Sequence, residues 1–313
     1  MAEEEKPQEK KRNIFLHIYD VHYKKLLIFP MFLLLLSFVI IGGHYFMTGE
    51  VIARDISLKG GTTITITTTS QIDEHSLELF LKSAIPQSEI TVRVLSASGR
   101  QIGFIVETDI QDEQEINQLL NSIQEKTGQL TKDQFSVQTI GSSLGGSFYR
   151  EALVALVIAF IFMGLVVLVY FRNLVPSLFV ILCSFADIIM PFAVLVLFGV
   201  KLSTAGIAAF LMLIGYSVDT DILLTTRVLR GKEGTIFERT VGAVRTGLTM
   251  TLSAIAVALV AYFFSQSETI KQIMFILSIG LFFDIFNTWI TNVAILRWYL
   301  ERKHKHHESS SHQ

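Results

Sequence analysis

The chain has 313 residues, of which 50% are hydrophobic and only 17% are charged, and its formal net charge is −2. A soluble protein of this length is rarely so apolar, so the composition indicates a membrane protein with several spans. The net charge gives no reason to expect a nucleic-acid partner, and the single cysteine, Cys183, excludes a disulfide framework and a cysteine-rich zinc site.

The first segment of the chain is charged, and an apolar run follows it. We expect residues 1–25 to form a cytoplasmic tail, of which residues 1–13 are disordered. Residues 26–46 are expected to form the first transmembrane helix, because about 20 apolar residues cross a bilayer. No small-residue cleavage pattern follows this run, so we interpret it as a retained anchor and not as a signal peptide that is removed.

Residues 47–146 are polar. Segments in which apolar residues recur at every second position, as in a strand, alternate there with segments of helical spacing. The expected order is strand, helix, strand, strand, helix, strand. The corresponding segments are 62–68, 73–85, 89–96, 100–108, 112–126 and 134–140. This order predicts an α+β ferredoxin-like (βαββαβ) domain between the first and second transmembrane helices.

Five more apolar runs follow within residues 147–300, and each is long enough to cross a bilayer. They lie at 151–170, 175–199, 202–224, 246–264 and 273–296. The predicted fold is therefore a polytopic α-helical membrane protein with six transmembrane helices and one inserted domain. Residues 301–313 are expected to be a disordered cytoplasmic tail whose histidines are solvated and bind no metal.

Positively charged side chains gather on one side of the predicted membrane, which is expected to be the cytoplasmic side. The short connections on the opposite side hold only Lys201 and Lys271. Both termini are therefore expected in the cytoplasm, with the ferredoxin-like domain outside the plasma membrane. The residues counted on the cytoplasmic side are Lys10, Lys11, Arg12, Lys24, Lys25, Arg172, Arg227, Arg230, Lys232, Arg239, Arg245, Arg297, Arg302, Lys303 and Lys305.

The connection between the fourth and fifth spans has a pattern of its own. Apolar residues recur there at helical spacing, with Glu238 and Arg239 on the opposite side. This pattern predicts an amphipathic helix near 233–244 that lies on the cytoplasmic face of the membrane.

Four aspartates fall within the predicted spans. Asp187 lies near the middle of the third span and Asp284 near the middle of the sixth, while Asp219 and Asp221 lie in the cytoplasmic half of the fourth. A charged side chain at the bilayer centre costs at least about 2.5–3.5 kcal/mol, so such residues normally face a bundle interior or a water-filled path. Because removal from water favours the protonated carboxyl group, all four are candidates for an ion or proton relay.

Asp219 and Asp221 are two residues apart, so their side chains point to roughly opposite sides of one helix. Arg245 stands at the cytoplasmic start of the fifth span, at a depth that suits an ion pair with one of them. Alternatives without a functional role stay open: Asp221 could simply be hydrated near the headgroups. Asp187 and Asp284 could be structural hydrogen-bond acceptors between helices.

The sequence lacks the usual catalytic motifs. It has no Gly-Lys-Ser/Thr phosphate loop, no nucleophile elbow and no His-Glu-x-x-His helix. The Gly-x-Gly-Asp pattern of intramembrane aspartyl proteases is also absent. We therefore expect a protein that is not an enzyme, needs no cofactor, and draws its energy from an ion gradient or from partners.

Several stretches together resemble the SecD/SecF family within the RND superfamily. They are DISLKGGTTITI (55–66), IGSSLGGSFYREALVALVIA (140–159), SFADIIMPFAVLVLFG (184–199), IGYSVDTDILLTTRVLR (214–230) and RTGLTMTLSAIA (245–256). The SVDTD form is similar to the archaeal SecF branch. Two features depart from the bacterial pattern. Ser142 stands in place of a proline, and Asp219 and Asp221 flank the position of the acid in Gly-Tyr-Ser-x-Asn-Asp-Thr.

The resemblance implies an auxiliary subunit of the Sec protein-export machinery. Such a subunit lies in the membrane lipid, pairs with a SecD-like subunit as a heterodimer, and draws on the proton gradient. It assists a SecY-type translocon and contacts the translocating polypeptide. It also implies an ion-coupling role for Asp219 or Asp221 and for Asp187, and a match of Arg245 to the family's arginine in the fifth span. Asp284 is a candidate mainly because of its depth.

Two other functions stay open at this point. One is an RND-type proton-coupled transporter of small molecules or lipids that acts alone, and the other is a scaffold whose aspartates are structural. RND bundles commonly combine twelve spans as two related halves, and this chain supplies six, which favours a heterodimer. The sequence leaves the coupling ion open between H⁺ and Na⁺.

Overall fold

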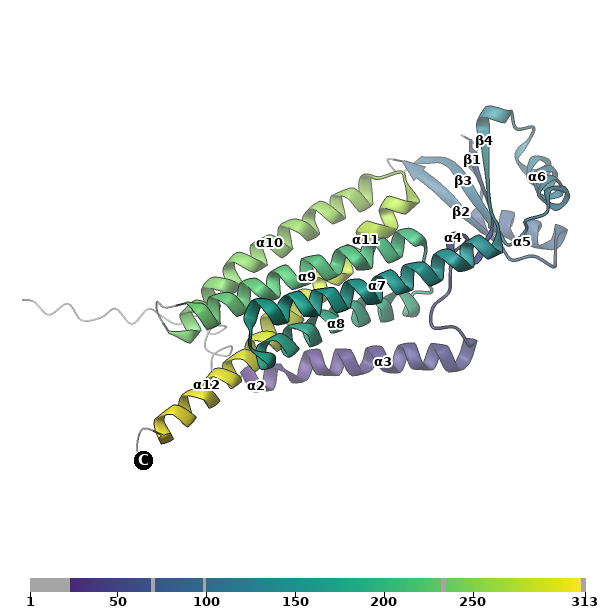
Figure 1. Ribbon diagram of the computed structural model, residues 1–313. Coiled ribbons are helices and arrows are strands. Elements are labelled where there is room, and N and C mark those ends of the chain that lie inside the picture. The colour runs from purple at the N-terminus through teal and green to yellow at the C-terminus, as the bar shows by residue number, and fades with distance from the viewer. Residues whose placement is uncertain (1–22, 69–70, 98–99, 232–234, 311–313) are drawn as a thin grey trace, which may run out of the picture.

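The computed structural model describes residues 23–68, 71–97, 100–231 and 235–310. It consists of a long helix bundle with a small sheet domain at one end (Figure 1). Within the described residues, six helices are long and apolar enough to cross a membrane, which confirms the prediction of six spans. They are α3 (Ile28–Thr48), α7 (Ser142–Phe171), α8 (Leu174–Leu197), α9 (Thr204–Arg230), α10 (Ile236–Phe264) and the sixth, Glu268–Leu300. A short helix, α2 (Tyr23–Leu26), precedes α3.

The sixth span is not a uniform α-helix. It begins as α11 (Glu268–Phe286), passes through one π-helical segment, η2 (Asn287–Asn292), and continues as α12 (Val293–Ser310). The helix therefore enters the segment 301–310, for which the sequence analysis predicts disorder. Leu, Arg, Glu and Lys, which have high helix propensity, are frequent along α12, and they extend the helix beyond the apolar run.

α7 begins earlier than its apolar run predicts. Its 30 residues give a length of about 45 Å, more than the roughly 30 Å of a hydrocarbon core. Hydropathy identifies only the part of a helix that can lie in lipid. The helical hydrogen bonds of the backbone continue until a residue interrupts them, so the helix can be longer than its apolar run. The first turns of α7 therefore extend past the bundle to the sheet domain (Figure 1).

The separate amphipathic helix predicted near 233–244 is absent from the described part of this segment. Ile236–Val244 instead form the first turns of α10, which continues without a break to Phe264. Thr235 caps this helix: its hydroxyl accepts from the Glu238 N–H, and the Glu238 carboxylate accepts from the Thr235 N–H. No proline follows this capping box, so the amphipathic turns and the apolar span become one helix. Residues 233 and 234 lie outside the described ranges.

The sheet domain has four antiparallel strands in the order β2-β3-β1-β4. They are β1 (Gly61–Thr67), β2 (Ile90–Ala97), β3 (Arg100–Thr108) and β4 (Phe135–Ile140). Two helices, α5 (Glu74–Ala84) and α6 (Glu113–Thr127), cover one face of the sheet (Figure 1). The apolar core lies between these layers and includes Ile64, Phe104, Val106, Leu81 and Leu119.

The sheet domain is joined to the bundle through backbone contacts. The Asp55 N–H donates to the Leu202 carbonyl at 2.8 Å, and the Leu202 N–H donates to the Ala53 carbonyl at 2.8 Å. Leu202 lies in the connection between α8 and α9, so the chain entering the domain pairs with a connection at the same end of the bundle (Figure 1). The short helix α4 (Ile56–Lys59) then packs against the start of α7. These contacts fix the domain at one end of the spans.

A matched pair of glycines tests the α4–α7 contact. A Cβ atom on Gly145 would lie 2.7 Å from the backbone nitrogen of Gly60, whereas one on Gly146 would meet nothing within 4 Å. Gly145→Ala is therefore expected to destabilise the chain by about 1–3 kcal/mol through overpacking. Gly146→Ala is expected to be neutral or to stabilise it by up to about 1 kcal/mol, because alanine favours the helix. Thermal unfolding in detergent checks both variants, and equal midpoints would contradict the packing argument.

Candidate functional site

Three aspartates from three spans meet in the middle of the bundle. Asp187 of α8, Asp221 of α9 and Asp284 of α11 each have 0% of their surface exposed. We refer to these three residues as the carboxyl cluster. Because a buried carboxyl group is costly unless it has hydrogen-bond partners, the groups that surround the cluster determine what it can do.

Asp187 accepts hydrogen bonds from two other helical segments. The Ser217 hydroxyl of α9 donates to one carboxylate oxygen at 2.5 Å, and the Asn287 side-chain amide of η2 donates to the other at 2.6 Å. The same Asn287 amide lies 3.7 Å from the Met190 sulfur. Asp187 therefore links α8 to α9 and to the sixth span.

Asp221 and Asp284 share one hydroxyl group. The Thr288 oxygen lies 3.1 Å from an Asp221 carboxylate oxygen and 2.9 Å from one of Asp284. Asp221 also accepts from the Asn292 side-chain amide at 2.7 Å. The Thr220 hydroxyl lies 3.1 and 3.3 Å from the two oxygens of Asp284 and 2.8 Å from the Ser217 carbonyl. Threonine hydroxyls thus connect the two carboxyl groups into one network.

The π-helical segment η2 supplies most of these donors. Asn287, Thr288 and Asn292 are all buried and all contact the carboxyl cluster. The wider π turn lets residues five apart face the same side, and such segments occur frequently at functional sites. These three residues are not among the candidates predicted from the sequence. Their polar character at positions 3, 4 and 8 after Asp284, inside an apolar span, is the signal that predicts them.

No Lys or Arg side chain among the described residues forms an ion pair with the carboxyl cluster. One oxygen of Asp221 is buried without a hydrogen-bond partner there. Nor do three His, Cys, Asp or Glu side chains within the described ranges lie close enough together to hold a metal ion. Carboxyl groups in this setting are chemically suited to binding and releasing protons.

Asp219 does not join the carboxyl cluster. It lies on the opposite, exposed side of α9, as the two-residue offset from Asp221 requires. Met212 and Tyr216, on the same side, are each 45% exposed, and a Cβ atom on Gly215 would meet nothing within 4 Å. We call these four residues the open face of α9. α9 contacts α7, α8, α10 and α11, and the open face is the side of this central helix that remains exposed.

Arg245 is exposed and pairs with neither Asp219 nor Asp221 in the described part of the chain. Ala243 and Gly247 are the buried residues of this turn of α10. Arg245 is two positions from each of them, so its side chain points away from the packed side. Gly247 is required there because a Cβ atom would collide with the Trp289 ring. The ion pair predicted from depth alone is therefore wrong: depth was suitable, but the rotation of α10 turns Arg245 outward.

The burial and contacts of these aspartates bear on the structural alternatives predicted from the sequence. A hydrated Asp221 near the headgroups is wrong, because the residue is completely buried. Asp187 and Asp284 do accept hydrogen bonds across helices, as the structural alternative requires. That contact pattern and a role in proton binding do not exclude each other.

Known proteins similar to this chain point to one family. The family described as "Protein export membrane protein SecD/SecF, C-terminal" matches residues 120–302. The chain is 35% identical over 287 residues to the protein-export membrane protein SecF of Pyrococcus furiosus, covering 91% of this chain and 94% of that protein. It is 37% identical over 285 residues to SecF of Methanocaldococcus jannaschii, covering 89% and 96% of the two chains.

The fold is also similar to solved structures of SecDF. The crystal structure of SecDF from Thermus thermophilus, described as a translocon-associated membrane protein, has a TM-score of 0.69 and 20% identity. The match covers 93% of this chain but only 39% of the SecDF chain, so this chain spans about two fifths of that protein. A second structure, SecDF in its super-membrane-facing form, has a TM-score of 0.55 and 18% identity. The chain belongs to the SecD/SecF family of protein-export membrane proteins, in its SecF branch.

Proposed function

We propose that this multi-pass membrane protein is an auxiliary subunit of the Sec export machinery, which pairs with a SecD-like subunit and uses the proton gradient. The ferredoxin-like domain lies outside the plasma membrane and both termini lie in the cytoplasm. The positive side chains at one end of the spans support this orientation. In this arrangement the subunit assists a SecY-type translocon, and the outer domain is available to the emerging polypeptide.

Proton coupling is supported mainly by the number of hydroxyl hydrogens that are available for hydrogen bonds to the carboxyl cluster. Each threonine hydroxyl has one hydrogen to donate. If Thr288 donates to Asp221, and Thr220 donates to the Ser217 carbonyl, both hydroxyl oxygens still contact Asp284 with no hydrogen between them. A proton on Asp284 would supply a donor to one of these contacts. Three ionised carboxylates without a cation would also repel one another at short range.

The open face of α9 supports the pairing. Asp219 is exposed on a helix that is long and apolar enough to span the membrane, and an ionised side chain facing lipid is costly. A second set of helices packed against this face would shield Asp219 and fill the space above Gly215. The match to about two fifths of SecDF fits a chain that supplies one half of a larger bundle.

The first test is co-purification from native membranes in a mild detergent, with mass spectrometry of the bound proteins. A SecD-like protein at equal stoichiometry, with or without translocon subunits, is the expected result. Recovery of the chain alone would contradict the pairing and would favour a transporter that acts by itself.

A further inference from the structure

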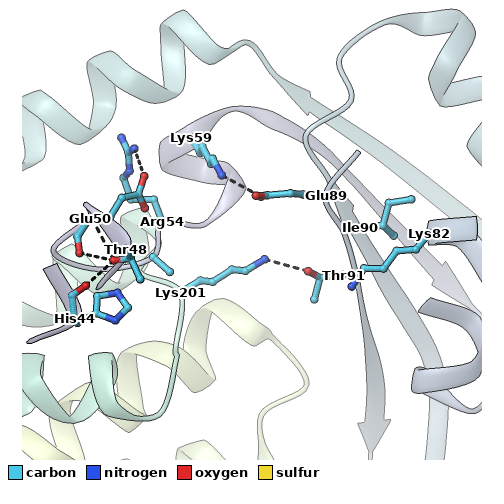
Figure 2. A pocket seen from close by; sticks show the side chains of 11 residues that line it. His44, Thr48, Glu50, Arg54, Lys59, Lys82, Glu89, Ile90, Thr91 and Lys201 are labelled. Atoms are coloured by element: carbon cyan, nitrogen blue, oxygen red, sulfur yellow. Dashed lines mark hydrogen bonds and ion pairs between the residues drawn. The ribbon is translucent and has the colours of Figure 1, made fainter. Parts of the chain in front are cut away.

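A second polar site lies between the sheet domain and the bundle, well away from the carboxyl cluster. It is an open cavity of about 400 Å³. Its walls come from the end of α3, the chain entering the sheet domain, α5, the start of β2 and the connection between α8 and α9 (Figure 2). α3 and α8 are candidate spans that end beside this cavity, so it lies at the level where the membrane surface meets the domain.

The cavity carries an excess of positive charge. Four Lys or Arg side chains line it, against two carboxylates. Arg54 pairs with Glu50 at 2.9 Å and Lys59 with Glu89 at 3.0 Å, so both lining carboxylates are neutralised. The hydrogen bond and charge of Lys59, with a smaller effect of the Lys201 charge, hold the pKa of Glu89 below its ordinary value. Lys82 and Lys201 are the remaining positive charges of the lining.

Lys201 has no carboxylate partner among the described residues. Its ammonium donates to the Thr91 hydroxyl at 3.1 Å, which leaves its charge unbalanced and two of its three hydrogens available. Lys82 pairs with Glu78, which does not line the cavity. Figure 2 shows Lys82 and Lys201 extending from two different elements toward Thr91 of β2, while Lys59 extends to Glu89 just before that strand. Lys82 and Lys201 therefore approach the same part of the cavity, and neither is paired with a carboxylate that lines it.

We propose that this cavity binds a phosphate group between Lys82 and Lys201. A phosphate is compact and offers several oxygens that can accept from both ammonium groups at once, and lysine binds it as a point charge. The volume exceeds what a phosphate needs and leaves room for the groups attached to it. Two sources share this chemistry: the headgroup of a membrane phospholipid and a soluble phosphate. The proposal does not depend on the function proposed above.

The test uses the full chain purified in an uncharged detergent. Thermal unfolding is measured with inorganic phosphate, with chloride at equal ionic strength, with dioctanoyl phosphatidylglycerol, and with dioctanoylglycerol, which has the same tails without a phosphate. Both phosphate-bearing ligands are expected to raise the unfolding midpoint, and their counterparts are not. A phospholipid affinity at least about tenfold above that of phosphate identifies the lipid as the source, whereas similar affinities identify soluble phosphate.

Variants that remove a lysine charge test whether the shift in the unfolding midpoint comes from binding in the cavity. Lys82→Gln and Lys201→Gln keep polar side chains and are each expected to weaken binding about tenfold, the value of one charge-assisted hydrogen bond. Lys201→Arg restores the charge and is expected to retain binding. Lys126→Gln, on the exposed surface of α6, is the control for loss of a positive charge. Its ammonium lies over the Phe80 ring and not in the cavity, so binding of the ligands should be unchanged. If Lys201→Gln lowers the midpoint without ligand, native mass spectrometry of retained phospholipid replaces the thermal readout.

Two results would overturn the proposal. In the first, neither phosphate-bearing ligand shifts the midpoint beyond its counterpart, or the shift persists in both glutamine variants. In the second, polyglutamate stabilises the chain while phosphate and phosphatidylglycerol do not, which would assign the cavity to an acidic polypeptide.

Discussion

Asp221→Asn is expected to reduce the response of export to a proton gradient to the level seen without a gradient. Asparagine keeps the oxygen that accepts from Thr288 and Asn292, and its amide takes the place of the carboxylate oxygen that has no partner. The substitution removes the negative charge of Asp221 and its ability to exchange a proton with Asp284 through Thr288, but it keeps the shape of the side chain. The free energy of unfolding should therefore change by about 1 kcal/mol or less. Transport into membrane vesicles, with and without an imposed gradient, measures the effect.

Asp219→Asn is the matched comparison for this experiment. It makes the same chemical change two residues away on the same helix, but outside the carboxyl cluster. Most of the gradient response should remain in this variant. If Asp219→Asn abolished the response while Asp221→Asn preserved it, the relay would run along the open face of α9 and not through the cluster.

Gly215→Trp is expected to separate the chain from its SecD-like partner while the chain itself stays folded. A Cβ atom at position 215 would meet nothing within 4 Å, and replacing a glycine inside a helix removes an unfavourable residue. In the proposed pair, the same indole ring would occupy the space of the neighbouring helices. Co-purification of the partner should therefore fall to background, with an unchanged unfolding midpoint for the chain alone.

Leu35→Trp in α3 controls for the effect of adding a large aromatic side chain to a span. Leu35 is 64% exposed and lies on a helix that packs against α8, away from the open face of α9. Partner recovery should be unaffected by this variant. Loss of the partner in both variants, or in neither, would mean that the open face of α9 is not the pairing surface.

Local sequence patterns account for the number of spans and for the strands and helices of the sheet domain. Apolar runs of about 20 residues mark spans because only helices of that length satisfy the backbone in lipid. Alternation in β1 and helical spacing in α5 reflect which side of each element is buried, so they can be recognised without any knowledge of the partners. The opposite directions of Asp219 and Asp221 also follow from helix geometry alone.

Packing between the helices determines which of the two aspartates faces the interior of the bundle. A span that is apolar on every side carries little information about its rotation, so the sequence could not tell whether Asp219 or Asp221 faced the bundle. The contacts of α9 with four neighbouring helices buried Asp221 and left Asp219 exposed. The same uncertainty explains the wrong ion pair of Arg245, whose depth was suitable but whose direction was set by Gly247 against Trp289.

Length, hydropathy and periodicity are local properties, so they were enough to predict a six-span membrane protein with an inserted α+β segment and acidic residues at membrane depth. The folded chain shows in addition that three of the four aspartates are buried together and that a π turn supplies Asn287, Thr288 and Asn292 to them. The rotation and register of each helix depend on all of its neighbours at once, and no single segment of sequence contains that information.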